Sequence, residues 1–353
     1  MTIDLTPLAS ATRLLFKIPL EPLQGKRFQP TGFPSLGAAT FQTDRGTSLL
    51  VESAQSMANR LEMTVWDDAN KDVADEFKGL SHVRVTRNGR FFTDTILESH
   101  RINSPYVLTS SDRAFLDPFL KTLRDQLGEG TVDRNEGLVD RHGFARTLLR
   151  YDCGCLLHGC FLSNDKVKLN PGGKGVALAG GRLRVARALS AFIEADNVRV
   201  APSGGVKNDP LNPSGVTKDG FGNVPFARDE YTAESITLYV NLDLAQIRGY
   251  ALGSNVERLL ILLALYKLRA LTDDGMRLRT ACDLRAERGI IEAKLPEGWV
   301  LPALADLKGE VKTAIASCND RMVVSEAKFE DELKKGKVQE VAESDDADET
   351  GVE

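Results

Sequence analysis

The segment from Ser254 to Leu271 restricts the possible folds more than any other part of the chain. Ser254 and Glu257 match the S-x-x-E capping box that opens an α-helix. The helix that follows is apolar on nearly all sides, and a helix of that kind must lie inside the core. Its longest apolar run, residues 259–266, has eight residues, which is too short to cross a membrane. We therefore expect a fold built around one buried helix.

The other predicted elements indicate an α+β fold. In chain order they are a strand at 11–20, a helix at 49–63, a hairpin at 82–93 turning at Asn88-Gly89, a strand-like segment at 146–162, a helix at 181–195, a strand at 236–242, the helix at 254–271 and a strand at 276–284. This order accommodates a β-α-β-β-α-β core, the ferredoxin-like arrangement, in which the helices pack on one face of an antiparallel sheet.

Two long loops interrupt this core. The first covers residues 24–48, and the second, at 201–232, is rich in glycine and proline and is predicted to be a mobile loop. We expect residues 1–325 to form a single domain. Beyond it, residues 326–353 carry 11 acidic and 4 basic side chains and are predicted to be a disordered acidic tail.

The net charge of −5 conceals an uneven distribution. The tail accounts for −7, so residues 1–325 are mildly basic, with 41 basic and 39 acidic residues. Residues 141–187 hold nine Lys or Arg and two acidic residues, and they include the glycine-rich sequence at 170–175. Such a stretch favours a track for phosphate groups; the alternative is a solvated basic face. The pattern of a nucleotide-binding P-loop is not met, because Gly175 and Val176 follow Lys174.

The sequence also excludes several classes of protein. The N-terminus lacks the basic and apolar regions of a secretion signal, and five cysteines, an odd number, fit reduced thiols better than a disulfide framework. We therefore expect a soluble cytoplasmic protein. No H-E-x-x-H, G-x-S-x-G or paired-carboxylate motif occurs, so neither a catalytic residue nor a cofactor is expected.

The predicted helix at 49–63 has an outward face of uncharged polar residues with one cation: Ser53, Gln55, Ser56, Asn59 and Arg60. Exposed helix faces are usually rich in Lys and Glu. Hydrogen-bonding groups with a single positive charge suit a sugar–phosphate chain. The alternative is a polar face packed under the neighbouring loop.

Two further groups invite a chemical interpretation. Cys153, Cys155, His158 and Cys160 resemble a set of zinc ligands, but their spacing is not the paired C-x2-C pattern of structural sites. We expect small core residues there and no metal. His142, predicted in an exposed loop, could act as a general acid or base in RNA cleavage.

Four segments carry a resemblance to a known family: GKRFQPTGFPSLGAATF (25–41), LLVESAQSMANRLE (49–62), SHRINSPY (99–106) and RVARALSAFIEA (184–195). Together they resemble the backbone subunit of the type I-G CRISPR surveillance complex, formerly type I-U, in the Cas-seven branch of the RAMP superfamily. The resemblance extends over roughly residues 11–285.

The resemblance implies an RRM-like palm with large insertions called fingers and a thumb. It implies that several copies bind along one guide RNA (crRNA) in Cascade, together with other Cascade subunits, and that the guide pairs with a target DNA strand. No membrane partner is implied. The finger is expected at about 66–140. The thumb is expected at about 201–232, although the finger insertion could supply it instead.

Carried onto this sequence, the resemblance implies two sets of contacts. The RNA-binding residues are Lys26, Arg27, Phe28, Gln29, Ser53, Gln55, Ser56, Asn59, Arg60, His100, Arg101, Asn103, Ser104, Arg182, Arg184 and Arg187. The thumb residues that displace bases are Lys207, Lys218, Phe221, Phe226 and Arg228. The expected function is a non-catalytic subunit that forms a filament on guide RNA for antiviral defence. The alternatives are a metal-independent endoribonuclease that processes the guide precursor and a zinc-dependent nucleic-acid protein.

Overall fold

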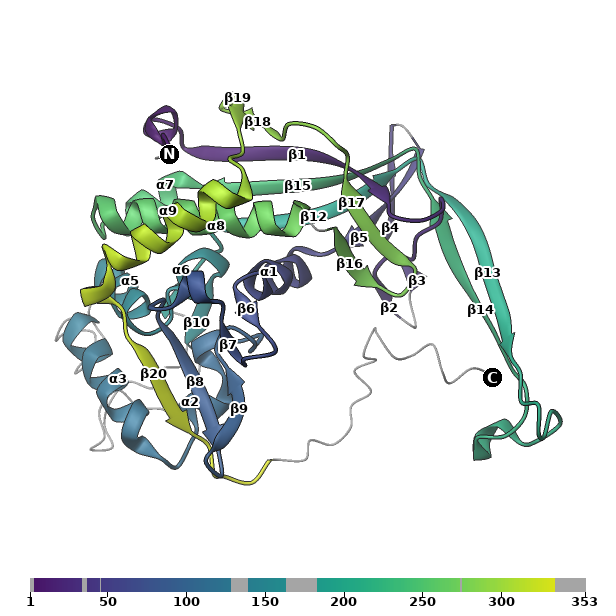
Figure 1. Cartoon of the computed structure of the whole chain (residues 1–353), viewed down its shortest axis with the longest axis horizontal. Coiled ribbons are helices and arrows are strands. Elements are labelled where there is room, and N and C mark those ends of the chain that lie inside the picture. The colour runs from purple at the N-terminus through teal and green to yellow at the C-terminus, as the bar shows by residue number, and fades with distance from the viewer. Residues whose placement is uncertain are drawn as a thin grey trace.

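A seven-strand path of one antiparallel sheet organises the computed structural model, which describes residues 3–33, 37–44, 46–127, 139–162, 183–273 and 275–333 (Figure 1). The strands are, in spatial order, β16 (Met276–Arg279), β17 (Cys282–Ala286), β1 (Arg13–Pro22), β15 (Ser235–Asp243), β12 (Leu189–Asp196), β5 (Gly46–Glu52) and β4 (Thr40–Thr43). A further hairpin, β18 (Glu292–Leu295) and β19 (Glu297–Val300), joins this sheet at β1.

The core lies between this sheet and helices on one of its faces. The buried residues of β1 are in register with the apolar residues of β15, so that Phe16 lies opposite Val240 and Ile18 opposite Leu238. Beneath them runs α8 (Ser254–Asp273), the expected central helix, with α1 (Ala54–Met63), α7 (Leu244–Gly249) and α9 (Leu304–Ala316) beside it (Figure 1).

A second group of elements completes the body below these helices (Figure 1). Its three-stranded sheet has the order β20 (Val324–Lys328), β8 (His82–Arg87), β9 (Arg90–Asp94). The helices α2 (Pro105–Leu108), α3 (Arg113–Leu127), α5 (Arg141–Tyr151) and α6 (Gly154–His158) pack against this group. Short strand pairs are β2 (Gly32–Phe33) with β3 (Gly37–Ala38), β6 (Trp66–Asp67) with β7 (Asp72–Val73), and β10 (Cys160–Leu162) with β11 (Leu183–Val185). Single 3₁₀ turns lie at Thr6–Leu8, Asp75–Phe77, Arg101–Asn103, Thr217–Asp219 and Asn319–Arg321.

A two-stranded hairpin projects far from the body (Figure 1). It consists of β13 (Arg199–Lys207) and β14 (Val224–Thr232), which pair without interruption from Arg199↔Thr232 to Lys207↔Val224. We call residues 199–232 the arm and residues 208–223 its tip. At about 3.3 Å per residue, strands of this length extend by roughly 30 Å. The prediction of a mobile loop at 201–232 is therefore wrong, because alternating backbone pairing outweighs the glycine and proline content.

Several predictions from the sequence are confirmed. The strands at 11–20 and 236–242 and the helix at 254–271 are present. The turn at Asn88-Gly89 has positive φ at both residues, as a type I′ hairpin requires. Within the described residues, no helix is long and apolar enough to span a membrane.

Other element predictions are wrong, and each error has a physical cause. Residues 183–196 form two strands instead of a helix, because burial alternates at every second residue of β12. Residues 146–162 are mainly helical, since α5 and α6 bury a helical stripe there. The expected helix at 49–63 begins only after Ser53, and its first residues belong to β5. The expected strand at 276–284 is two strands.

The start of the acidic tail also needs correction. Residues predicted to be disordered from 326 onward include the end of β20, which pairs in parallel with β8 through Lys328↔Thr86. Phe329 follows and is buried against Phe92 and Tyr106. The sequence from 334 to 353 lies outside the described residues.

Candidate nucleic-acid interface

A groove lies between α1 and β16, with a volume of about 410 Å³. Four residues of the predicted polar helix or its last turn line one wall, and the segment around β16 forms the other. The lining residues are Ser56, Asn59, Arg60, Met63, Leu271, Gly275, Met276 and Arg277. The groove thus combines hydroxyl, amide and guanidinium groups with the apolar side chains of Met63, Leu271 and Met276, and its polar groups suit an anionic chain.

The local sequence explains why this face of α1 points outward. Ser53 caps the helix by accepting a hydrogen bond from the Ser56 N–H at 3.3 Å. From that start, Met57 and Leu61 fall on the buried side, whereas Gln55 and Asn59 are exposed. Gln55 and Asn59 of the predicted polar face are therefore accessible, whereas Ser53, Ser56 and Arg60 are half-buried.

Glu52, at the end of β5, holds the two walls of the groove together. Its buried carboxylate accepts a hydrogen bond from Arg279 and lies 3.7 Å from the Arg60 guanidinium. Arg60 also donates to the carbonyl oxygens of Arg277, at 3.0 Å, and Leu278. Arg60 is therefore largely engaged inside the fold, as a bridge between α1 and β16.

Arg277 is the accessible cation of this groove. Its side chain is exposed, and within the described ranges no hydrogen bond or ion pair engages its guanidinium. Because Arg60 makes the bridging contacts, Arg277 remains available to an anion outside the protein.

The first predicted loop lies beside the base of the arm. Arg279 donates to the Gln29 carbonyl at 3.0 Å, and the Gln29 N–H donates to the Ala281 carbonyl at 2.9 Å. Phe28 forms an isolated β-bridge with Tyr231 and is fully buried. Burial removes the Phe28 ring from any direct contact with RNA, which corrects that part of the expected set.

Arg27 and Lys26 of the same loop are exposed. Arg27 donates to the Pro202 carbonyl at 3.4 Å and lies 3.9 Å from the Glu230 carboxylate. The loop, the arm base and the groove are thus joined through a continuous set of contacts.

The expected group at 100–104 divides into exposed and buried members. Arg101 is buried, and its Nε donates to Glu62 at 2.8 Å while Nη1 donates to the Gly159 carbonyl at 3.3 Å. Ser104 is also buried, where it caps α2 and donates to Glu98. These two residues are structural and cannot contact RNA directly. His100 is exposed, and Asn103 is partly exposed.

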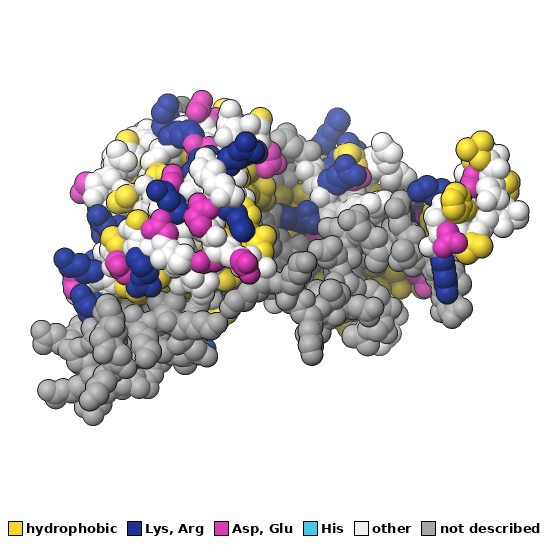
Figure 2. Space-filling model, turned by 90° about the horizontal axis from the view of Figure 1, so that it is seen from below, with side chains coloured by type: hydrophobic (Ala, Val, Ile, Leu, Met, Phe, Trp, Pro, Cys, Tyr) yellow, Lys and Arg dark blue, Asp and Glu magenta, His cyan; other side chains and the backbone are white. Residues whose placement is uncertain are grey.

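The basic stretch at 141–187 does not form one track in the described residues. Arg141, Arg146 and Arg150 lie on α5, whereas Arg184 and Arg187 lie at β11 and just after it. Burial, together with the nearby positive charge of Arg101, lowers the pKa of Arg187. The face of the body seen in Figure 2 carries basic and acidic side chains interspersed. Arg182, Lys166, Lys168, Lys174 and the glycine-rich sequence lie outside the described residues.

The arm ends in an ordered, apolar tip. Asp209 accepts hydrogen bonds from the N–H groups of Leu211, Asn212 and Gly222, which also lower the pKa of its carboxyl. Hydrophobic side chains gather at this end of the molecule (Figure 2). They include Leu211, Val216 and Phe221, which are 95%, 60% and 54% exposed.

The expected thumb residues occupy the arm. Phe226 is 42% exposed, and Lys207 and Lys218 are exposed as well. Arg228 forms an ion pair with Glu230 at 2.9 Å. It is therefore neutralised within the arm.

The cysteine–histidine group is part of the core. Cys153, Cys155 and Cys160 are buried free thiols. Burial raises the pKa of Cys153 to about 11 and that of Cys155 well above its usual value, which keeps both thiols protonated. The described residues contain no group of three or more His, Cys, Asp or Glu side chains placed to hold a metal ion.

His158 has a different partner from the one a metal site would need. Its Nε2 lies 2.8 Å from the buried Nζ of Lys267. Burial and the Lys267 charge lower the pKa of His158 well below its usual value, so the neutral ring accepts a hydrogen bond from Lys267. Burial lowers the pKa of Lys267 to about 8.

Because Lys267 is buried, we expect the free energy of unfolding to depend on pH. Between the folded-state pKa of about 8 and the reference value of 10.5, the unfolded chain binds more protons, so the free energy of unfolding rises with pH. We expect the Lys267→Met variant to lack this contribution. Chemical unfolding at several pH values should give a wild-type-minus-variant difference that rises by up to about 3 kcal/mol from pH 8 to 10.5. A difference that stays constant over this window would contradict the assignment.

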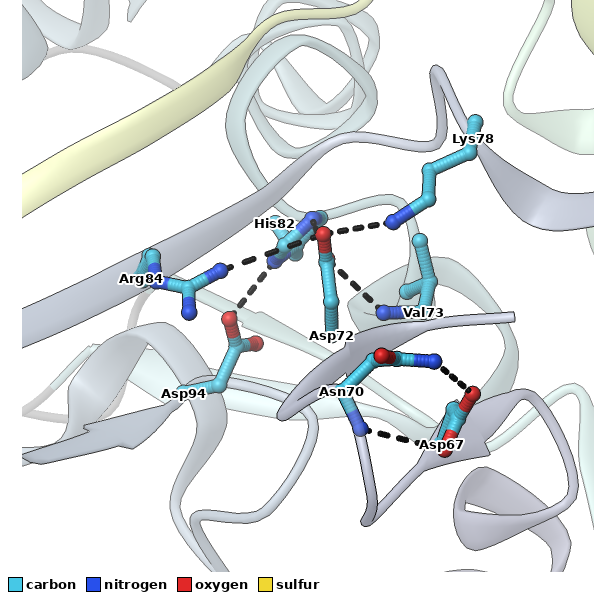
Figure 3. Close-up of polar contacts among 8 residues, drawn as sticks. All are labelled: Asp67, Asn70, Asp72, Val73, Lys78, His82, Arg84 and Asp94. Atoms are coloured by element: carbon cyan, nitrogen blue, oxygen red, sulfur yellow. Dashed lines mark hydrogen bonds and ion pairs between the residues drawn. The ribbon is translucent and has the colours of Figure 1, made fainter. Parts of the chain in front are cut away.

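A second buried histidine ties two hairpins together (Figure 3). His82 Nδ1 lies 2.7 Å from Asp94 Oδ2, and its Nε2 lies 4.0 Å from Asp72 Oδ1. Asp72, on β7, also pairs with Lys78 at 2.5 Å and with Arg84 at 3.9 Å. His82 is 1% exposed, so a nucleic acid cannot reach it. The cluster fastens β6–β7 onto β8.

His142 has no comparable setting. It was predicted in a loop but lies exposed in the first turn of α5, next to the capping residue Asp140. Sequence reasoning also missed Glu52 and Arg277, which act at the groove. No local pattern distinguishes them from ordinary charged residues, since their role arises only when β5 and β16 meet α1.

Solved structures and a protein family relate this chain to known proteins. Two solved structures are similar in shape at low level. One is a chain of a CRISPR RNA-guided surveillance complex, pre-nicking, with 12% identity, a TM-score of 0.38, and coverage of 78% of this chain and 76% of that chain. The other is Csc2 from Thermofilum pendens, with 11% identity, a TM-score of 0.31, and coverage of 90% and 78%. No curated protein matches the chain.

The family comparison is decisive because of its extent. A family model described as CRISPR-associated protein GSU0053 matches residues 14–200, which is more than half of the chain. The match covers β1, the first loop, α1 and the β10–β12 region described above. The chain therefore belongs to the CRISPR-associated GSU0053 protein family.

Proposed function

We propose that this protein is a non-catalytic backbone subunit that binds guide RNA and assembles in several copies along it. The observation that carries the proposal is the junction of three features at one place. The polar groove of α1 and the first loop meet through Glu52, Arg279 and the Gln29 backbone, and the same loop reaches the base of the arm through the Phe28–Tyr231 bridge. Family membership supports a role in CRISPR defence.

The chemistry of the groove favours a nucleic-acid backbone. Ser56 and Asn59 offer hydrogen bonds without charge, and Arg277 offers one accessible guanidinium. Contacts of this kind position a phosphate chain without reading its sequence. A protein that leaves sequence recognition to base pairing needs contacts of this kind.

The arm supports the second half of the proposal. Its apolar tip has no covering surface among the described residues of the same chain, with Leu211 almost fully exposed. A large exposed apolar patch at the end of an ordered projection marks an interaction site. We propose that the arm is the thumb and that its tip contacts the next copy on the RNA.

The sheet topology is consistent with the proposed palm. The strands β17, β1, β15 and β12 lie in that order, with α1 in the chain between β1 and β12 and α8 following β15. This order is that of a β-α-β-β-α-β unit. We infer a ferredoxin-like, RRM-like palm from which the arm and the finger insertion at about 66–140 extend.

The subtype of CRISPR complex to which the protein belongs is also part of the proposal. The resemblance of the four sequence segments supports the type I-G Cascade backbone. Its partners would then be guide RNA, a target DNA strand paired to the guide, further copies and other Cascade subunits, in the cytoplasm and without a membrane. No metal or cofactor is needed for these roles.

The competing function is metal-independent cleavage of the guide precursor. Repeat-containing RNA should be incubated with purified protein in the presence of a chelator and separated on a denaturing gel. We expect bound but intact RNA. Discrete cleavage that His142→Ala abolishes would overturn the non-catalytic proposal, and Arg141→Ala, which changes the exposed neighbouring residue, serves as a control for loss of RNA binding at this surface.

A further inference from the structure

We propose that Phe161, His100 and Arg184 form a platform on which one unpaired nucleobase of the bound RNA stacks. This inference rests on the proposed function and adds a contact to the base, which the groove does not supply. Phe161 is absent from the contacts expected from the sequence. It lies in β10 between two buried neighbours, Cys160 and Leu162, so that its ring points away from the core.

Three exposed side chains of suitable chemistry meet at this place. Phe161 is 45% exposed, which leaves part of its ring open to a ligand. The His100 ring stands perpendicular to it at 6.4 Å between centroids, with an interplanar angle of 83°. Arg184 on β11 is directly opposite Phe161 in the strand pair and is exposed.

Contacts made by Gly159 and Arg101 hold this platform beside α1. Gly159, with φ of +79°, allows the turn before β10 to approach the backbone of residues 185–187, where an added Cβ would lie 3.0 Å from the Val185 carbonyl oxygen. The Gly159 carbonyl accepts a hydrogen bond from Arg101, whose other contacts go to Glu62 at the end of α1. Through these contacts the platform is held rigidly relative to the helix that carries the groove.

The combination matches the way single-stranded nucleic acids are held. An exposed aromatic face attracts any base without regard to its identity, and a neighbouring guanidinium can stack on the base or pair with its phosphate. His100 packs edge-on and leaves ring surface of Phe161 open to the solvent. A protein partner would need an apolar surface, whereas the described exposed residues beside Phe161, His100 and Arg184, carry an imidazole and a guanidinium.

The test compares two ligands and four variants of the full chain. The ligands are single-stranded RNA with 2-aminopurine at successive positions and inorganic polyphosphate, which has charge without bases. We expect Phe161→Ala to weaken RNA binding about 5- to 100-fold and to reduce quenching of 2-aminopurine. Polyphosphate binding should not change. Phe161→Trp should retain affinity and quenching, because a larger ring still stacks.

Phe41→Ala is the matched control, since Phe41 is a similarly exposed phenylalanine, 39%, on β4. Unchanged RNA affinity of Phe161→Ala, with a melting temperature equal to that of wild type, would overturn the platform. The proposed function would still stand after that result if Arg277→Glu weakened the binding of both RNA and polyphosphate. A wild-type protein that binds neither ligand would instead contradict the proposed function itself.

Discussion

Replacing residues 208–223 of the arm tip by Asn-Gly should abolish the binding of several copies to one RNA, while the monomer stays folded. The replacement joins Lys207 and Val224, the last paired residues of β13 and β14, through a turn that suits a two-residue hairpin. It removes Leu211, Val216 and Phe221, whose apolar surfaces are exposed in the single chain. Because these residues make no core contacts, the melting temperature should change little.

Native mass spectrometry with a long guide RNA measures this effect. Wild type should give complexes with several protein copies, and the shortened variant should give mainly one. A control variant, Ile290→Ser, changes an equally exposed apolar residue elsewhere on the body, with 73% exposure. If the shortened variant assembled as wild type does, the arm would not be the thumb.

The second large effect is expected from Arg277→Glu. Reversal of this accessible charge at the α1–β16 groove should weaken RNA binding about tenfold or more, equally for RNAs of different sequence. The slope of log affinity against log salt concentration should fall by about one for each copy bound. Binding titrations at several salt concentrations measure both quantities.

Charge reversal at Arg277 tests RNA binding by the groove better than charge reversal at Arg60. A glutamate at position 60 would stand next to the buried carboxylate of Glu52, now 3.7 Å from Arg60, and would disrupt the fold. Arg90→Glu is the matched control, because Arg90 is an exposed arginine on β9 in the separate three-stranded sheet. Equal losses for Arg277→Glu and Arg90→Glu would indicate a general charge effect, and no loss for Arg277→Glu would exclude the groove.

Predictions from the sequence were correct where the residue pattern within one segment determines its structure. The alternating apolar residues of β1 and β15 and the largely buried α8 identify the centre of the fold. The outward position of Gln55 and Asn59 on α1 is also confirmed, since helical spacing determines which residues turn outward, whereas Arg60 of the same predicted face is bonded inside the fold.

Predictions from the sequence were wrong where contacts between segments far apart in the chain determine the local structure. In β12, small alanines at alternate positions also fit a helix, and only the pairing with β15 and β5 selects the strand. Phe28 and Arg101 look like exposed binding residues. Their burial depends on Tyr231 and Glu62, which lie far away in the chain. Likewise, Arg277 becomes the accessible cation only because Arg60 is held by Glu52 and two carbonyl groups.

The central claim is that copies of this protein assemble along guide RNA, and the number of copies as a function of RNA length tests it most directly. Complexes of wild-type protein with guide RNAs of one, two and three times a starting length should be measured by native mass spectrometry. Our account predicts a copy number that increases in proportion to RNA length, with the RNA intact. A single copy at every length, or RNA cut into discrete products, would contradict it.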